Sequence, residues 1–249
     1  LLQRFPLEAG VPPGFEILDD ETGRVLRREA VDVVLTAATR DTASNLGRAL
    51  ETMIAFAAGD GFDEVLALAL EERDWLDAMS RRELTAEDGA DGVAGLYRRM
   101  LGLADDATLA TVEQAMAGVL ADAELRRMRD VLAAGTSTDQ DNAATLDAAL
   151  SASGAASRAA ALAGYFLTGK GEPRARLLTA GVGKAHPDAE PILTRAQGRF
   201  CKLEAERRGL VLADATAALV CVGDAVLQRY GEAKARRAAL DFDDLIVRT

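Results

Sequence analysis

The segment that comes closest to a catalytic motif is residues 164–171, which reads Gly-Tyr-Phe-Leu-Thr-Gly-Lys-Gly. It matches the two glycines and the lysine of a phosphate-binding P-loop, but Gly171 stands where the pattern needs a hydroxyl for Mg²⁺. A P-loop also follows a buried strand and opens a helix, whereas here an Ala-rich helical stretch comes before and Pro173 comes after. We therefore interpret the segment as the end of a helix with a glycine stop and a basic terminus.

Other reactive side chains also lack the spacing that chemistry would need. Three aspartates near the C-terminal end could form an acidic metal cluster: Asp241, Asp243 and Asp244. No apolar strand precedes them, as a Walker B aspartate requires, so we interpret them as capping and first-turn carboxylates of a helix. His186 has no cysteine nearby, and Cys201 and Cys221 lack a C-x-x-C spacing. We expect no catalytic residue and no metal site, and two reduced, buried thiols.

Positive charge concentrates in residues 170–208. This segment holds nine Lys and Arg against five Asp and Glu, a formal charge of +4, while the rest of the chain carries −15. Arg195, Arg199 and Lys202 recur at spacings of four and three, which places them on one face of a helix. An apolar face on the same helix is formed by Leu193, Ala196, Phe200 and Leu203. A basic stripe of this kind can follow the phosphates of a nucleic acid.

The stripe also has a simpler interpretation, as a solvated helix face with i,i+4 pairs such as Lys202 with Glu206. Basic faces are common on helices of soluble proteins, so the residues by themselves favour this interpretation. Both interpretations remain open at this point.

The elements that must position these residues are helices. Apolar residues recur at spacings of three and four through most of the chain, which predicts a mainly α, irregular multi-helix domain. We expect one amphipathic helix over 62–79, a polar break over 137–142, and helix from 191 to 230 with an interruption at Gly209. Four glycines and three prolines in 168–191 predict a loop, with at most a small hairpin near 168–182.

Composition excludes several classes of protein. Hydrophobic residues make up 49% of the 249 residues and aromatic residues 4%, which indicates an Ala- and Leu-rich globular protein. A net charge of −11 excludes a uniformly basic nucleic-acid-binding domain but allows a local basic patch. Arg4 and Glu8 interrupt any N-terminal signal peptide, and Asp214 and Asp224 make the most apolar window, 209–227, too polar to span a bilayer. We expect a cytoplasmic protein without a membrane partner.

Both ends of the chain carry a resemblance. Residues 240–246, Leu-Asp-Phe-Asp-Asp-Leu-Ile, with Tyr230 and Lys234 upstream, resemble the segment before the Walker B strand in superfamily 1 helicases of the UvrD/PcrA/RecB type. Residues 1–11 resemble the run after motif Ia in AddA, the helicase–nuclease subunit of bacterial double-strand-break repair.

Two further runs, 166–168 and 172–174, are also similar to the AddA family, whereas residues 36–153 offer no motif to match. The chain has no initiator Met, and its last helix is cut after two turns. We therefore expect the chain to be a piece of a longer protein.

The resemblance implies that residues 21–235 form the accessory domain 1B of an AddA-type helicase. Residues 1–20 and 236–249 would be flanks that belong to domain 1A. The ATPase motifs would lie outside the chain, so ATP and Mg²⁺ are implied for the parent helicase and no cofactor for this chain. The parent would work with an AddB-like subunit on broken DNA ends in recombination.

Resemblance and charge together predict contacts to duplex DNA near the fork. The expected DNA-binding residues are Arg174, Arg176, Arg195, Arg199 and Lys202. The alternative function is a stand-alone α-helical protein-interaction or scaffold module, against which the abrupt ends argue.

Overall fold

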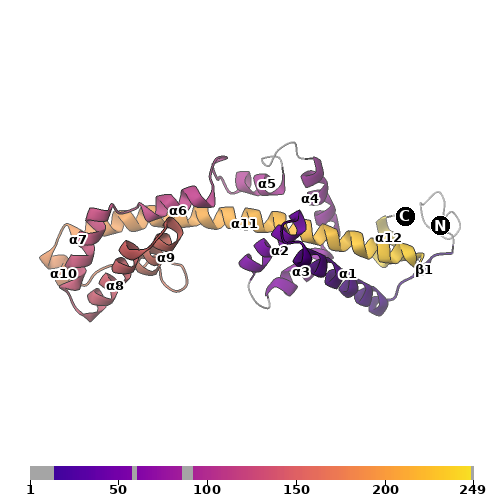
Figure 1. Ribbon diagram of the computed structural model, residues 1–249, viewed down its shortest axis with the longest axis horizontal. Coiled ribbons are helices and arrows are strands. Elements are labelled where there is room, and N and C mark those ends of the chain that lie inside the picture. The colour runs from indigo at the N-terminus through magenta and orange to yellow at the C-terminus, as the bar shows by residue number, and fades with distance from the viewer. Residues whose placement is uncertain (1–13, 58–60, 86–91, 248–249) are drawn as a thin grey trace. The chain divides into compact units, whose positions relative to one another are not determined.

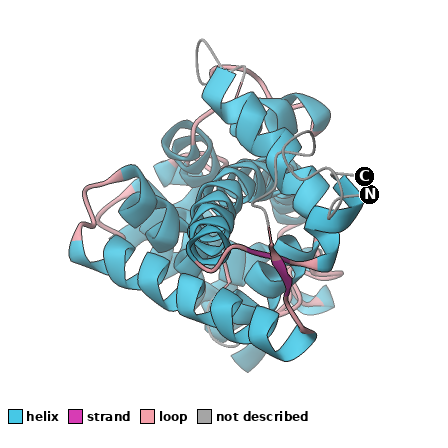
Figure 2. Cartoon of the chain, turned by 90° about the vertical axis from the view of Figure 1, so that its right-hand side faces the viewer, coloured by secondary structure: helices cyan, strands magenta, loops and turns pink. Residues whose placement is uncertain are grey.

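The computed structural model describes residues 14–57, 61–85 and 92–247, and these are almost entirely helical (Figures 1 and 2). The first helices are α1 (Asp20–Arg40), α2 (Asn45–Phe56), α3 (Gly61–Glu71), α4 (Arg73–Thr85), α5 (Val93–Met100) and α6 (Leu109–Ala117). They are followed by α7 (Asp122–Ala133), α8 (Ser137–Ser151), α9 (Ala155–Phe166), α10 (Ala180–Ala185), α11 (Ala189–Arg236) and α12 (Phe242–Val247). The predicted mainly α, multi-helix fold is confirmed.

Two short β features accompany the helices. Leu167 and Pro173 form an isolated antiparallel bridge around a turn in which Gly171 has a φ of 75°, which is the small hairpin that the sequence allowed. A second feature was not predicted: β1 (Glu16–Ile17) pairs in parallel with β2 (Ala239–Leu240). Two-residue strands carry too little pattern to be recognised in a sequence.

Three predicted helix boundaries are wrong, each for a physical reason. Residues 137–142 are the first turns of α8 and not a break, because polar residues favour helix caps as much as loops. The helix predicted over 62–79 is two helices that meet at Glu72. Gly209 does not interrupt α11: the Leu103 side chain lies 3.2 Å from where a Cβ would stand, so the glycine makes room for a neighbour.

The chain forms two compact units. Unit 1 comprises Leu1–Tyr97 and Leu212–Thr249, and unit 2 comprises Arg98–Val211. Helix α11 contributes its first part to unit 2 and its second part to unit 1. The sequence predicted one helical domain over 21–235, and the assignment of its ends to helicase domains stays a prediction.

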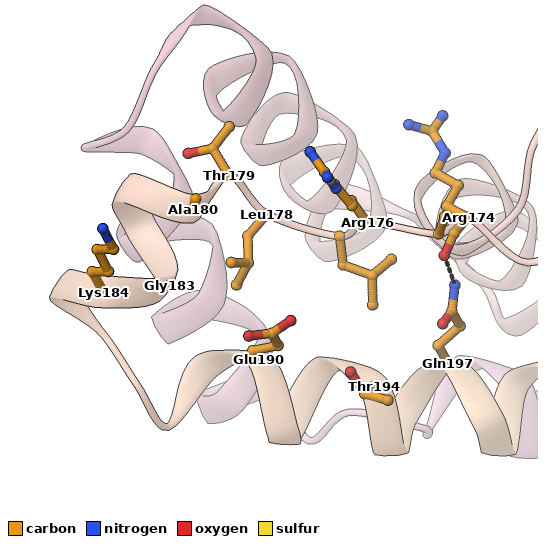
Figure 3. Close-up of a pocket in the computed structure, with 12 residues that line it drawn as sticks. Arg174, Arg176, Leu178, Thr179, Ala180, Gly183, Lys184, Glu190, Thr194 and Gln197 are labelled. Atoms are coloured by element: carbon orange, nitrogen blue, oxygen red, sulfur yellow. Dashed lines mark hydrogen bonds between the residues drawn. The ribbon is translucent and has the colours of Figure 1, made fainter.

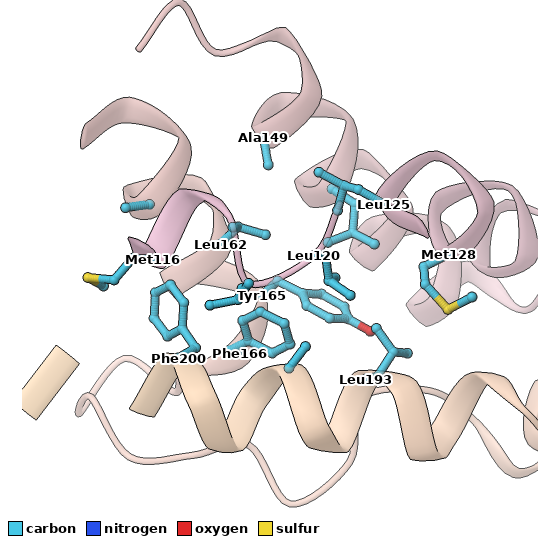
Figure 4. Packing of buried hydrophobic residues seen from close by; sticks show 14 of the residues in the cluster. Met116, Leu120, Leu125, Met128, Ala149, Leu162, Tyr165, Phe166, Leu193 and Phe200 are labelled. Carbon is cyan, nitrogen blue, oxygen red and sulfur yellow. The ribbon is translucent and has the colours of Figure 1, made fainter. Parts of the chain in front are cut away.

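The core of unit 2 gathers around an aromatic cluster between α9 and α11 (Figure 4). Tyr165 and Phe166 meet edge to face with ring centroids 5.1 Å apart, and Phe166 and Phe200 lie 5.4 Å apart. Such ring pairs add to the stability gained from burying their area. Leu146 and Leu162 complete the packing without any exposed surface.

The core of unit 1 is built from α1 to α4 and the second part of α11. Val222, Val226 and Tyr230 of α11 are buried in this core together with Leu26 and Leu76. The prediction that the most apolar window is too polar to span a bilayer is wrong: by length and composition, α11 contains a window apolar enough to cross a membrane. Within the protein, 44% of that window is buried. A core helix passes the same test, and the absence of a membrane partner stays a prediction.

Close packing of α4 against α11 depends on Gly223. The two Leu76 Cδ atoms lie 3.0 and 3.2 Å from the position of a Cβ on Gly223, whereas nothing lies within 4 Å of a Cβ on Gly231 in the same helix. We predict that Gly223→Leu lowers the free energy of unfolding by about 2 kcal/mol through overpacking. Gly231→Leu should instead raise it by up to about 1 kcal/mol through helix propensity.

Chemical denaturation followed by circular dichroism measures both variants. If Gly223→Leu were as stable as Gly231→Leu, the contact between Leu76 and α11 would be wrong.

Candidate nucleic-acid interface

The P-loop-like segment is the end of a helix followed by a tight turn, as the sequence predicted. Helix α9 ends at Phe166, and the turn closes with the Gly171 amide donating to the Thr168 carbonyl (2.8 Å). The guanidinium of Arg174 caps the helix: its Nε donates to the Leu167 carbonyl (2.9 Å) and Nη2 to the Gly164 carbonyl (2.8 Å). A buried strand does not precede the segment, so the geometry of a P-loop is not present.

Arg174 therefore has a structural task that the sequence did not reveal. Its guanidinium satisfies carbonyls left open at a helix C-terminus, and the side chain is half-buried. Arg176, two residues on, is exposed and has no ion-pair partner among the described residues. Of the two predicted DNA contacts in this loop, Arg174 is thus held against the end of α9, whereas Arg176 is exposed to solvent.

The basic stripe on α11 is formed as the spacing predicted. Arg195, Arg199 and Lys202 are all exposed, and the opposite side of the helix buries Leu193 and Phe200. The three cations form no ion pair with any residue that the structure describes. The i,i+4 pairing that the simpler interpretation predicted for Lys202 and Glu206 is not formed.

Pairing occurs one turn later and involves different residues. Glu204 is buried and accepts hydrogen bonds from Arg207 Nε (2.8 Å) and Arg208 Nε (2.8 Å). Burial raises the pKa of Glu204, but the guanidinium groups of Arg207 and Arg208 together lower it by more, so the net shift is downward. Arg207 and Arg208 are therefore paired with Glu204, and the cations of α11 without an ion pair among the described residues are those of the stripe.

The stripe and the Arg174–Arg176 loop do not form one continuous surface. Gln197 faces the loop, since its amide nitrogen donates to the Arg174 carbonyl at 2.9 Å (Figure 3). At 100° per residue, the helix face that carries Glu190, Thr194 and Gln197 lies about 140° around α11 from the face of the stripe. The structure brings Arg195, Arg199 and Lys202 together and leaves Arg174 and Arg176 apart from them.

The negative charge of the chain belongs mainly to unit 1. Unit 2 holds 15 Lys and Arg against 14 Asp and Glu, a formal charge of +1, so the remainder carries −12. Unit 2, which carries the stripe, is therefore close to neutral by itself.

Aromatic side chains of unit 2 are all inside it. Tyr165, Phe166 and Phe200 are the only Phe, Tyr or Trp residues in 98–211, a range that the structure describes throughout, and each is at most 1% exposed. Desolvation of Tyr165 and the charge of Asp139 raise the pKa of its hydroxyl, which donates to the Leu177 carbonyl (2.9 Å). Unit 2 therefore has no exposed ring on which an unpaired base could stack.

The aspartates near the C-terminal end form a cap and a buried ion pair. The Asp244 amide donates to Asp241 Oδ1 (3.0 Å), and the Asp241 amide donates to Asp244 Oδ2 (3.1 Å), which is a reciprocal capping arrangement at the start of α12. Lys234 Nζ contacts Asp241 at 2.9 Å and also contacts Asp244. The predicted capping role is confirmed.

Arg73, at the start of α4, completes this cluster. Its Nη2 lies 2.7 Å from Asp241 Oδ2, and both Arg73 and Lys234 lie over the Tyr230 ring, at 5.4 and 4.7 Å from its centroid. Burial raises the pKa of Asp241, but hydrogen bonds from Arg73, the Asp244 amide and Lys234 outweigh it and hold that pKa well below its usual range. Tyr230, Lys234 and Asp241 are thus in contact with one another.

The remaining candidates do not assemble a site. In the part of the chain that the structure describes, no group of three His, Cys, Asp or Glu residues is placed to hold a metal ion. His186 follows the last residue of α10, and its amide caps that helix on the Val182 carbonyl (2.8 Å). Cys201 and Cys221 are free and half-buried beside the two cores, and burial raises the pKa of both thiols.

Comparison of the chain with protein-family models, with curated proteins and with solved structures found no match. The AddA resemblance therefore stays a prediction. Its N-terminal part, residues 1–11, lies outside the described residues, and its C-terminal part includes the capped segment at Asp241.

The ion pair of Asp241 should be worth far more than that of its neighbour Asp243. Asp241→Asn removes the counter-charge of buried Lys234 and half-buried Arg73, and we predict a loss of about 3 kcal/mol in the free energy of unfolding. Asp243 is 56% exposed and 3.6 Å from Arg73, so Asp243→Asn should cost less than about 1 kcal/mol.

The difference in stability between Asp241→Asn and the unchanged chain should become smaller as pH falls. Because the folded pKa of Asp241 is depressed, its stabilisation is present above the ordinary carboxyl pKa of about 4 and is lost as pH falls through the folded value. Urea denaturation at pH 7 and pH 3 should show the gap between Asp241→Asn and the unchanged chain narrowing at pH 3. A gap that widened on acidification would contradict the assigned ion pair.

Proposed function

We propose that this chain is the accessory 1B domain of an AddA-type superfamily 1 DNA helicase. In this proposal, unit 2 contacts the duplex backbone near the fork through Arg195, Arg199 and Lys202. The observation that carries it is that these three cations share one exposed face of α11 and have no ion-pair partner among the described residues. The Leu-Asp-Phe-Asp-Asp-Leu-Ile resemblance supplies the helicase context.

The dimensions of the stripe suit a phosphate backbone. Seven residues of α-helix rise about 10 Å, and phosphates on one DNA strand repeat at about 3.4 Å along the duplex axis. The stripe therefore spans about three phosphates. Contacts of this kind position a duplex without reading its sequence.

A duplex fits this surface better than a single strand does. Proteins that bind single strands without sequence preference stack bases on aromatic rings, and the aromatic rings of unit 2 are buried. The stripe can supply electrostatic attraction to a phosphate backbone. Unit 2 is nearly neutral, so its own net charge does not repel that backbone.

Catalysis belongs to the parent protein in this proposal. ATP and Mg²⁺ would bind to helicase motifs outside this chain, and an AddB-like subunit would join through the parent. In this proposal the chain is cytoplasmic and contributes DNA contacts. No residue in it is assigned to a reaction.

One surface of unit 1 favours a second candidate, a helical protein-interaction module. Phe56 and Leu212 are 47% and 41% exposed and line an apolar pocket of about 160 Å³ with Met53, Val65 and Leu219. Exposed apolar patches of this kind mark protein contacts. If that were the function, Leu212→Asp would abolish partner binding, while changes to the stripe would have no effect on any measured binding.

The DNA proposal is tested by reversing the charge of the stripe. The 249-residue chain should bind a blunt duplex weakly, on the order of 10⁻⁴ M, with a log–log salt slope of about −2.7 for three neutralised phosphates. Arg195→Glu, Arg199→Glu and Lys202→Glu together should remove measurable binding in fluorescence anisotropy at low salt.

A matched control separates local from overall charge. Arg28, Arg40 and Arg81 are exposed cations of unit 1, and changing all three to Glu alters the net charge by the same amount. This control should keep most of the affinity and the salt slope. Equal losses in the two triple variants would sink the assignment of the stripe.

A further inference from the structure

Helix α12 of unit 1 presents an apolar face to solvent. Phe242 and Ile246 are 61% and 76% exposed, and their spacing of four residues places them on one side of the helix. Another side of α12 is held in place, because Leu245 packs against the buried Phe15 and Leu240. The helix is therefore fixed to unit 1 while two large apolar side chains remain in water.

An acidic pocket of about 370 Å³ lies beside this face, between α12 and the junction of α3 with α4. Ile246 belongs to the apolar face and also lines the pocket, so the two features are adjacent. Arg73 is the one cation among the described residues that line the pocket. The same lining contains six carboxylates, those of Glu71, Glu72, Asp74, Asp77, Asp243 and Asp244.

The positive charge of Arg73 is already used within the chain. Its guanidinium pairs with Asp241 at 2.7 Å and lies 3.6 Å from Asp243 and 3.8 Å from Asp244. The other four carboxylates of the pocket form no ion pair with any residue in the described part of the chain. The pocket therefore has negative charge that the described residues do not neutralise.

Local helix chemistry explains only part of this charge. Asp74 lies in the first turn of α4, where the helix dipole favours a carboxylate. Glu71 is the last residue of α3, where the dipole disfavours one. Asp77 lies beyond the first turn and is three residues from Asp74, so the two neighbours on α4 repel each other. Cations supplied from outside the chain would relieve this repulsion.

We infer that α12 and the acidic pocket together bind a basic amphipathic helix of a partner protein. Apolar side chains of the partner pack on Phe242 and Ile246, and its Lys and Arg side chains enter the pocket. Exposed apolar surface rimmed by charge is typical of protein contacts, and complementary charge selects the partner. Nucleic acids and acidic segments are repelled by the same carboxylates.

A helix suits this surface better than an extended segment does. An amphipathic helix carries an apolar row and a basic row next to each other, which is how the apolar face and the pocket are arranged. Side chains of an extended segment alternate between two opposite sides. The surface belongs to unit 1 and the basic stripe to unit 2, so this inference does not depend on the proposed duplex contact.

The test is calorimetric titration of the full 249-residue chain with a synthetic amphipathic helical peptide made of Leu and Lys. The peptide should bind with a Kd below about 100 μM at low salt, and more weakly as the salt concentration rises. The same peptide with Glu in place of Lys should not bind.

Two pairs of substitutions locate the bound peptide. Asp74→Asn with Asp77→Asn should weaken binding by about fivefold, since two exposed charge pairs are lost. Phe242→Ser with Ile246→Ser should weaken it by about tenfold or more through lost apolar contact. Ile246→Lys keeps a good helix former in α12 and places a cation against the peptide, so it should weaken binding as well.

The exposed face of α1 offers matched controls, because it carries the same kinds of side chain outside the pocket. Glu29→Gln with Asp32→Asn removes the same charge, and Val25→Ser with Val33→Ser removes two valines that are 47% and 45% exposed. Both control variants should bind the peptide as the unchanged chain does.

Three results would overturn the inference. The first is no saturable binding at about 1 mM peptide, and the second is equal binding of the Lys and Glu peptides. The third is an equal loss of affinity in the pocket variants and the α1 controls, which would assign the attraction to the overall charge of the chain.

Discussion

The constraint on which the rest of the structure depends is the burial of α11. This helix runs for 48 residues, and each of the two units packs its core against a part of it. Leu193 and Phe200 belong to one core, and Val222 and Val226 to the other. Once an apolar side is buried, the 3.6-residue repeat decides which residues face solvent. The exposure of Arg195, Arg199 and Lys202 follows from the burial of their neighbours.

Buried polar side chains hold the parts that helix packing does not. Asp139 links the starts of α8 and α10 by accepting from Thr136 and Thr179, and its pKa is lowered because these hydrogen bonds outweigh its burial. Asp241 fixes α12 to α4 and to the end of α11 through Arg73 and Lys234. Such groups are costly when left alone, so each is surrounded by partners. They give irregular segments a defined position.

Local pattern was enough to predict the helices, the exposed stripe and the capping role of Asp241, because these depend on residues within one or two turns of one another. Contacts between distant residues left no local signal. Arg73 and Asp241 are 168 residues apart, and nothing near either predicts the other. The capping role of Arg174 was not predicted, because its charge is visible in the sequence and its hydrogen bonds to Gly164 and Leu167 are not.

The helix boundaries predicted at glycines and polar residues were wrong for the same reason, because local sequence does not show the contacts that these residues make. Glycine is typical of helix breaks, but Gly209 lies within α11 and leaves room for the Leu103 side chain.

Photo-crosslinking tests most directly whether duplex DNA lies along the stripe. Glu206 and Glu190 are both on α11 and lie about 160° apart around its axis, with Glu206 on the side of the stripe. A photoreactive amino acid at either position removes one carboxylate and leaves Arg195, Arg199 and Lys202 intact. With a closed duplex that has no free ends, position 206 should crosslink to DNA at low salt and position 190 should not. Crosslinking that was equal at both positions, or stronger at 190, would contradict the account.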